Sequence, residues 1–228
     1  MECDGAGAMI NFFKGEFLKH AAFTGGAVLM AAVAGGALSA EAAAPCVPLT
    51  SGEAALAHGI FGTLINTDII CKHFESEYRE KMAAAVTDDR NIYFYGPDYH
   101  EKDFSRTTRT YNKANIAHEE THIWQRQTML QYTNGRCDLY NYSPFNRKDF
   151  KDFCSEQQAA IIEDYTLRFF EGAPSRWLAG LFGADTPESD QSLMKLVEDM
   201  FPEAAKTRLA IEAKRVISAH KGQPLPAR

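Results

Sequence analysis

Residues 117–125 read AHEETHIWQ and contain the pattern H-E-x-x-H, which is typical of a metal-binding helix. On such a helix His118 and His122 lie four residues apart on one face, so both imidazoles can bind the same ion. Glu119 lies beside them as the candidate general base. A catalytic zinc site takes three protein ligands and keeps its fourth position for water. The motif therefore predicts a zinc centre whose third ligand comes from elsewhere in the chain.

The motif alone does not establish a metal site, because the same residues can occur by chance on a solvent-exposed helix face. The residues around the motif distinguish these two interpretations. Asn112 or Asn115 can cap a helix before the motif, and Asn134 followed by Gly135 can end it. Apolar residues recur between these ends near helical spacing, at Ile116, Ile123, Met129 and Leu130. The pattern predicts a helix of several turns around the motif.

The third ligand is expected from a second helix further along the chain. Residues 155–158 read SEQQ, a capping-box pattern that opens a helix ending near Gly172. Glu156 is the first choice of ligand and Glu163, seven residues later on the same face, is the second. Glu156 also fits an acid that the helix dipole favours in a first turn. Asp164 can orient a ligand histidine by accepting its second ring N–H, or it can be an ordinary helix acid.

The composition is that of an ordinary globular domain. The chain has 228 residues, of which 45% are hydrophobic and 24% are charged, and this is enough apolar material for a proper core. Its net charge of -6 provides no basic surface. We therefore expect no nucleic-acid partner. A peptide or protein substrate is expected from the H-E-x-x-H motif instead.

The first forty residues differ from the rest. Lys14 and Lys19 precede residues 21–40, which are apolar and uncharged, and Glu41 ends the run. This order predicts a signal peptide over residues 1–42. A retained membrane anchor is the alternative, but Ala and Gly make the run only weakly hydrophobic, which favours cleavage. We expect a periplasmic or secreted protein without a stable membrane anchor after cleavage.

Four cysteines lie in residues 43–228, which we predict to form a single domain. In an exported chain, four cysteines suggest two disulfides, with three connectivities open. Their spacing favours Cys46 with Cys71 and Cys137 with Cys154. Four buried thiols in a cytosolic protein are the alternative.

Outside the motif the sequence predicts more helices and a small sheet. Residues 50–64 read as a capped helix, residues 68–75 as a strand or loop, and residues 91–95 as an aromatic strand. The C-terminal region reads as helical, with Pro187 and Pro202 where helices can start. The expected fold class is α+β, mainly helical, with a small sheet.

Four segments together resemble a known family. They are NIYF at 91–94, YHEKDF at 99–104, HEETHIWQ at 118–125 and EQQAAIIEDY at 156–165. Their order is similar to the zinc metallopeptidase domain found in Vgr- and Rhs-associated bacterial proteins, over roughly residues 66–170. The resemblance implies a zincin-like fold of the glutamate-ligand type, with His118, His122 and Glu156 on Zn²⁺ and Glu119 as base. An association with a secretion system is left open.

In zincins, a strand upstream of the metal helix forms the sheet edge along which an extended peptide lies. Residues 91–95 are the candidate for this edge strand. An aromatic strand that serves only the core is the alternative.

The function expected from these features is that of an exported zinc metallopeptidase that hydrolyses peptide bonds. Candidates for stabilising the oxyanion are Tyr165, His100 and Tyr99, and the sequence does not choose among them. A secreted zinc-binding or interaction module without turnover is the main alternative. Two histidines and one carboxylate also suit a non-haem iron site. The substrate itself is not specified by the sequence.

Overall fold

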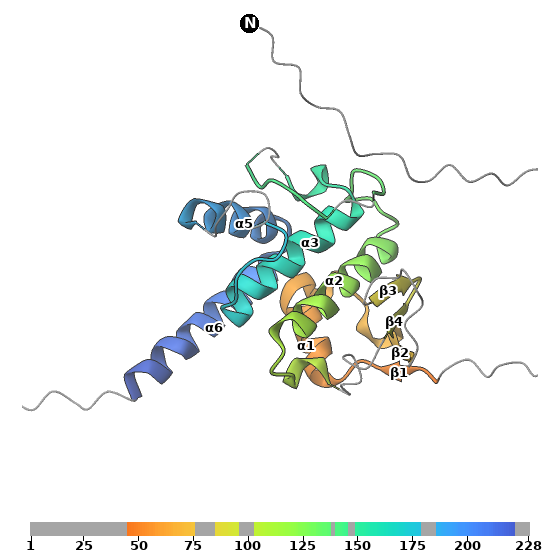
Figure 1. Ribbon diagram of the computed structural model, residues 1–228, viewed down its shortest axis with the longest axis horizontal. Helices are drawn as coiled ribbons and strands as arrows, with labels where there is room; N and C mark the ends of the chain where they lie inside the picture. Colours follow the sequence, from red (N-terminus) through yellow and green to blue (C-terminus); the bar gives the residue numbers. More distant parts are fainter. Residues whose placement is uncertain are drawn as a thin grey trace, which may run out of the picture. The chain divides into compact units, whose positions relative to one another are not determined.

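The computed structural model describes residues 45–75, 85–95, 103–137, 140–145, 149–178 and 186–221. These residues form helices and a small sheet, which confirms the predicted α+β, mainly helical class (Figure 1). The helices are α1 (Ser51–Phe61), α2 (Thr110–Gln127), α3 (Ser155–Tyr165), α5 (Pro187–Met200) and α6 (Pro202–Lys221). The strands are β1 (Val47–Pro48), β2 (Cys71–Glu75), β3 (Ala85–Asp88) and β4 (Asn91–Tyr95).

The sheet has the order β1-β2-β4-β3 within the described residues. β2 and β4 are parallel, whereas β1 and β3 pair antiparallel at the two sides. β4 has the predicted bounds, but the prediction that it forms the edge is wrong, because it is hydrogen-bonded to a strand on each side. The edge strand is β3, which joins β4 through Asp89 and Arg90, with Asp89 at φ 50. The short β3 carries no strong alternation and was not expected from the sequence.

The bounds of α2 differ from the expected ones. Asn112 and Asn115 lie inside its first turns, and no side chain caps its start. The helix stops well before Asn134, because Met129 and Leu130 adopt φ of 53 and 58. These left-handed conformations turn the chain away from the helix axis.

The start of α3 also corrects the expectation of a capping box. Cys154 is the N-cap and makes no side-chain cap hydrogen bond, so Ser155 is already helical. Glu156 lies in the first turn. The helix widens into a π-helical segment, Thr166–Glu171, and ends at Gly172 with φ 71. The predicted end near Gly172 agrees with the structure.

α2 lies between the sheet and α3, in contact with both β3 and α3 (Figure 1). Its Trp124 is fully buried at the centre of the core. The Trp124 ring stacks 5.9 Å from the Phe61 ring of α1 and meets the Phe201 ring edge-on at 5.0 Å. The helix that carries the H-E-x-x-H motif is thus also the central helix of the core.

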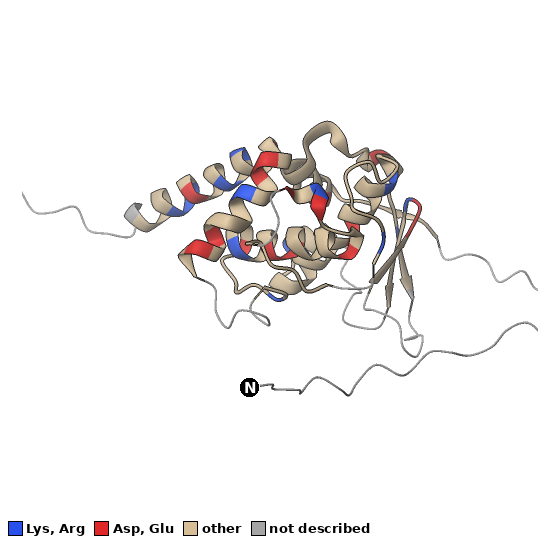
Figure 2. Cartoon of the chain, turned by 90° about the horizontal axis from the view of Figure 1, so that it is seen from above, with Lys and Arg blue, Asp and Glu red and all other residues tan. Residues whose placement is uncertain are grey.

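The C-terminal helices begin at Pro187 and Pro202, as predicted. α6 packs on α1 and α5. Its Arg208 pairs with Glu198 of α5 at 2.6 Å. Acidic and basic side chains are interspersed along α6, with neither charge confined to one end (Figure 2).

Both disulfides have the predicted pairing. Cys46 is bonded to Cys71 and Cys137 to Cys154. The first joins β1 to β2, and the second joins the loop after α2 to the start of α3. The expected signal peptide, residues 1–42, lies outside the described residues. Among the described residues, no helix is long and apolar enough to cross a bilayer.

A buried ion pair fixes α1 to the sheet. Lys72 of β2 lies 2.6 Å from Glu53 of α1, and both side chains are inaccessible to solvent. Glu53 also accepts hydrogen bonds from the backbone N–H groups of Thr50 and Phe104. Glu120 of α2 is buried nearby, and burial together with the charge of Glu53 raises its pKa well above the usual value. Lys72 is therefore the cation that balances this buried acidic region.

We expect Lys72→Met to lower the free energy of unfolding by about 3–5 kcal/mol, because it leaves a buried carboxylate without its partner. Denaturant unfolding measures the loss. The exposed Lys195, substituted by Met, is the control and should change stability by no more than about 0.5 kcal/mol. Adding Glu53→Gln to Lys72→Met should recover part of the loss, because the amide removes the buried charge and keeps an acceptor oxygen for the backbone N–H groups. A double variant no better than the single one would contradict the charge argument.

Candidate metal centre

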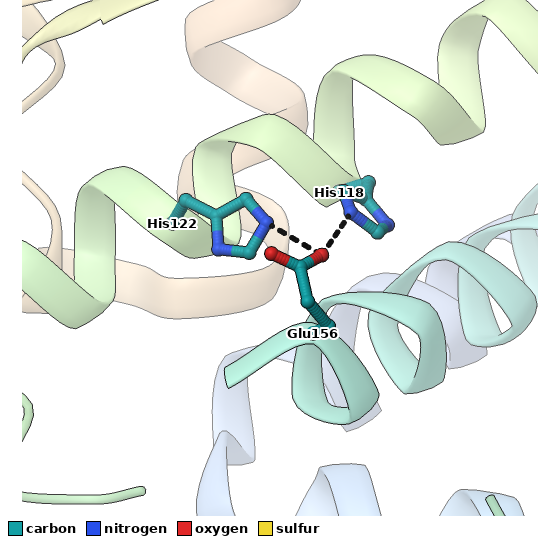
Figure 3. A group of neighbouring side chains, drawn as sticks. All are labelled: His118, His122 and Glu156. Atoms are coloured by element: carbon teal, nitrogen blue, oxygen red, sulfur yellow. Dashed lines mark ion pairs between the residues drawn. The ribbon is translucent and has the colours of Figure 1, made fainter. Parts of the chain in front are cut away.

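Two helices bring the expected ligands together. His118 and His122 extend from one face of α2 toward Glu156 in the first turn of α3 (Figure 3). Glu156 Oε2 lies 3.4 Å from His118 Nε2 and 3.3 Å from His122 Nε2. The three donor atoms lie within 4.8 Å of one another, so this group can hold a metal ion.

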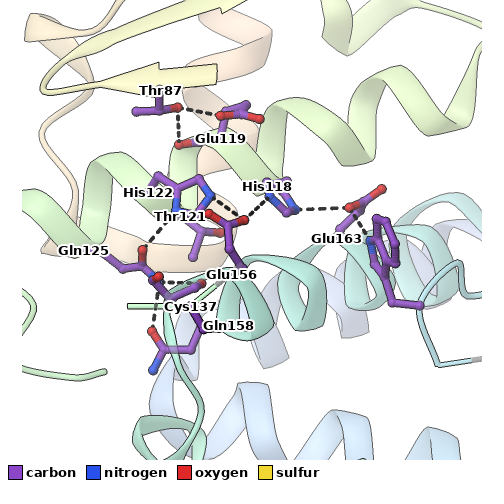
Figure 4. Close-up of polar contacts among 12 residues, drawn as sticks. Thr87, His118, Glu119, Thr121, His122, Gln125, Cys137, Glu156, Gln158 and Glu163 are labelled. Carbon is purple, nitrogen blue, oxygen red and sulfur yellow. Dashed lines mark hydrogen bonds and ion pairs between the residues drawn. The ribbon is translucent and has the colours of Figure 1, made fainter. Parts of the chain in front are cut away.

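The outer ring nitrogens of both histidines are also held. His118 Nδ1 lies 3.1 Å from Glu163 Oε2, and His122 Nδ1 lies 3.0 Å from Gln125 Oε1 (Figure 4). An acceptor at Nδ1 keeps the proton there and leaves the Nε2 lone pair for a metal. The supporting contacts therefore orient both rings toward the position beside Glu156.

Glu163, the second choice of ligand, occupies the position behind His118 for which Asp164 was a candidate. Glu163 is almost completely buried, and Trp177 Nε1 donates to it at 2.7 Å. Arg176 also donates to it, at 3.1 Å. Glu163 is thus placed as a support for a ligand, while Glu156 faces the two Nε2 atoms.

Asp164 contacts neither His118 nor His122 and makes its hydrogen bonds elsewhere. It accepts hydrogen bonds from the backbone N–H groups of residues 176–178 and from the hydroxyl of Tyr142. Burial raises the pKa of Asp164 to about 6, although these hydrogen bonds act in the opposite direction. Asp164 therefore fastens the segment that brings Arg176 and Trp177 to Glu163.

Tyr165, the one oxyanion candidate among the described residues, is not brought to this centre. Tyr165 is fully buried, and its hydroxyl donates to Glu198 at 2.8 Å and to the carbonyl oxygen of Ala204 at 3.2 Å. It points toward α5 and α6 because its position on α3 faces the core. His100 and Tyr99 lie outside the described residues.

The charges within the group explain why it suits a cation. Burial lowers the pKa of His118, but its hydrogen bonds to Glu156 and Glu163 outweigh this and raise the pKa to about 10. Burial raises the pKa of Glu156, but its hydrogen bonds to His118 and His122 lower it to about 2. Glu156 Oε2 thus faces both imidazoles. A divalent cation bound there requires neutral imidazole ligands, so its binding displaces protons.

Glu119 is positioned by the sheet. The hydroxyl of Thr87 in β3 donates to Glu119 Oε2 at 2.6 Å, and Glu119 is only 5% exposed. Thr87 was not singled out from the sequence, because its strand was not expected. One carboxylate oxygen of Glu119 is therefore fixed by β3, next to the His118 and His122 rings.

These side chains line one cavity of about 500 Å³. Ala85, Val86 and Thr87 of β3 form one wall. Tyr140 and Trp177 form another, with their rings stacked 4.7 Å apart and the Tyr140 ring 5.8 Å from the His118 ring. Nothing in the spacing of these two aromatics had distinguished them from the core aromatics around them. A cavity of this size can enclose several residues of an extended peptide or a small ligand.

Comparison with known proteins gives limited information. No protein-family model matches the chain, and no curated protein matches it. A solved structure, the effector domain of Pseudomonas aeruginosa VgrG2b, is similar to it at 26% sequence identity, over 69% of this chain and 84% of that chain. The TM-score is 0.44. Similarity at this level leaves the chemistry of the chain to be judged from its own residues.

We expect Glu163→Gln to weaken metal binding by about 10–100-fold, because outer acceptors of ligand histidines contribute this much to affinity. Competition with a zinc chelator measures the affinity. Glu212→Gln on α6 is the control, because this partly exposed carboxylate pairs with Arg208 and does not belong to the metal group, so the variant should keep the wild-type metal affinity. Equal metal affinities for wild type and Glu163→Gln would show that the His118 contact is only structural.

Proposed function

We propose that this chain is an exported zinc-dependent metallopeptidase that hydrolyses peptide bonds. The observation that carries the proposal is the convergence of His118, His122 and Glu156 beside Glu119 in one cavity. Two imidazoles and one carboxylate are a known ligand set for catalytic zinc. The supported orientation of both rings agrees with this assignment.

His118 Nε2, His122 Nε2 and a Glu156 oxygen are the atoms that hold the ion. Bound zinc supplies a Lewis acid for the scissile carbonyl and lowers the pKa of a water molecule to about 7. Glu119 takes the proton of the attacking water and returns it to the leaving amine. Thr87 fixes one oxygen of Glu119 and leaves the other to carry the proton.

β3 is the proposed guide for the substrate backbone. Within the described residues it is paired on one side only, and it lines the cavity beside Glu119. An extended peptide can add to such an edge through main-chain hydrogen bonds. Tyr140, which lines the same cavity, replaces Tyr165 as the proposed donor to the oxyanion.

The two disulfides support the proposed periplasmic or secreted location, because disulfides persist in oxidising compartments. The similarity of the sequence motifs to domains of Vgr- and Rhs-associated proteins supports an association with a secretion system. Residues 43–228 are proposed as the single mature domain.

A zinc-binding module without turnover is the competing proposal, and it predicts the same metal site. Two measurements on the purified mature chain separate the proposals. The first is its metal content, and the second is its hydrolysis of an unfolded protein with and without chelator. Variants of Glu119 and His122 then distinguish the two roles: loss of the general base lowers hydrolysis and leaves the metal bound, whereas loss of a ligand lowers the metal content.

A further inference from the structure

The cavity has two chemically different ends. Its length follows α2 from Asn115 to Arg126, which is roughly 16 Å at the rise of an α-helix. The aromatic pair Tyr140 and Trp177 lies at the His118 end, where both contact the group around Glu163. Two arginines, Arg126 and Arg136, line the cavity in the part contributed by the end of α2 and the following loop.

The two arginines at this second end make few interactions with other described residues. Within the described part of the chain, Arg136 is exposed and its guanidinium makes no hydrogen bond or ion pair. Arg126 donates to the carbonyl oxygen of Thr87 at 3.2 Å and lies 3.9 Å from the carboxylate of Asp88. Asp88 is 75% exposed, so this pair contributes little. Most of their donor capacity is left for a ligand.

The carboxylates of the cavity do not neutralise this end. Glu119 is bonded to Thr87, and Glu156 faces the two histidines. Glu163 is paired with Arg176 and His118. Arg126 and Arg136 therefore remain as an excess of positive charge in a chain whose net charge is -6.

The second disulfide fixes where this positive charge lies. Arg136 directly precedes Cys137, which is bonded to Cys154 at the start of α3. Cys154 is two residues before Glu156. The bridge therefore holds the backbone of Arg136 close to the helix that supplies the third ligand, on the His122 side of the centre.

We propose that Arg126 and Arg136 form a subsite for a substrate carboxylate, so that the peptidase selects peptides with an acidic group next to the scissile bond. This inference rests on the proposed function. A guanidinium binds a carboxylate through two parallel hydrogen bonds, which gives selectivity over the neutral amide. The carboxylate belongs either to an acidic side chain or to the free C-terminus of the peptide, and the two sources share the same chemistry.

The test uses quenched fluorescent peptides in matched pairs and the zinc-loaded mature chain. One set of pairs differs by Glu or Gln at each position beside the cleaved bond, and another differs by a free or amidated C-terminus. The wild type should cleave the acidic member of one set with a kcat/KM at least about tenfold higher. Arg136→Ala should remove this preference, so that the acidic and neutral members of a pair are cleaved with the same kcat/KM, while Arg136→Lys retains only part of it.

A control and a second measurement make the result specific. Arg106→Ala is the control, because Arg106 is 87% exposed and does not line the cavity. Calorimetric binding of the acidic and neutral peptides to zinc-loaded Glu119→Gln reports recognition without turnover. The preference for the acidic peptide should weaken as the salt concentration rises.

The outcomes separate the subsite from the peptidase. Cleavage of both members of every pair at equal rates overturns the subsite and leaves the peptidase standing. An absence of cleavage, together with binding of the acidic peptide that Arg136→Ala weakens, supports the subsite and overturns the peptidase. An absence of cleavage and equal binding of both peptides overturns both.

Discussion

Glu119→Gln is expected to lower the rate of peptide hydrolysis by about 10²–10⁴-fold, the usual contribution of a general base. The amide keeps the size of the side chain and still accepts the hydrogen bond from Thr87, but it cannot take a proton from water. The variant should retain stoichiometric zinc, because Glu119 is not one of the three converging ligands. Initial rates on an unfolded protein substrate and metal analysis of the same sample measure both quantities.

The control for this variant is Glu212→Gln on the exposed part of α6, which should match the wild type in rate and metal content. An active wild type whose rate is unaffected by Glu119→Gln would assign the proton transfer to another residue. A wild type that binds zinc but hydrolyses nothing would favour the interaction module over the enzyme.

His122→Ala is expected to lower zinc affinity by more than about 100-fold, beyond the range seen when only an outer acceptor is lost. The reason is geometric: without His122 Nε2, two donors remain, and Glu156 loses one of its partners. In the wild type, zinc at 1,000 times its dissociation constant should stabilise the fold by about 4 kcal/mol. In the variant, at the same zinc concentration, this stabilisation should fall to about 1.4 kcal/mol or less, and thermal unfolding with and without zinc measures it.

His58→Ala is the matched control for loss of an imidazole. His58 bonds the carbonyl oxygen of Gly62 and the hydroxyl of Thr67 and is not part of the metal group. Its loss should affect stability but leave the zinc-dependent rise in melting temperature intact. Metal analysis should include iron, since a wild type that retains iron in place of zinc would support the non-haem iron alternative.

The sequence predicts that the two histidines lie together because their spacing is local. His118 and His122 share a face by helical periodicity alone, whatever surrounds them. Glu156 and Glu163 also share a face, but they lie about 10 Å apart along the axis of α3. They therefore meet opposite sides of the histidine pair, Glu156 at the Nε2 atoms and Glu163 at Nδ1 of His118.

The different roles of the adjacent acids Glu163 and Asp164 could not be predicted from helical spacing. Glu163 and Asp164 are adjacent, so about 100° of rotation around α3 separates their side chains. Which of them faces α2 depends on how α3 is rotated against α2, and this is decided by packing. The same holds for Tyr165, which is turned toward Glu198.

The pairing of the strands could not be predicted from the sequence either. The aromatic pattern predicts β4 correctly, but not which strand lies on either side of it. β3 is only four residues long, and its place at the edge follows from the two-residue turn at Asp89 and Arg90. The ends of α2 were misjudged because residues with positive φ, Met129 and Leu130, gave no signal of that conformation in the sequence.

The central position of α2 constrains how such a protein can diversify. Trp124 of this helix packs in the interior only two residues beyond His122, so a change that shifts the helix disturbs the ligand geometry and the domain's cohesion together. We expect changes of specificity instead at Arg136, which is exposed and lines the cavity from outside the core.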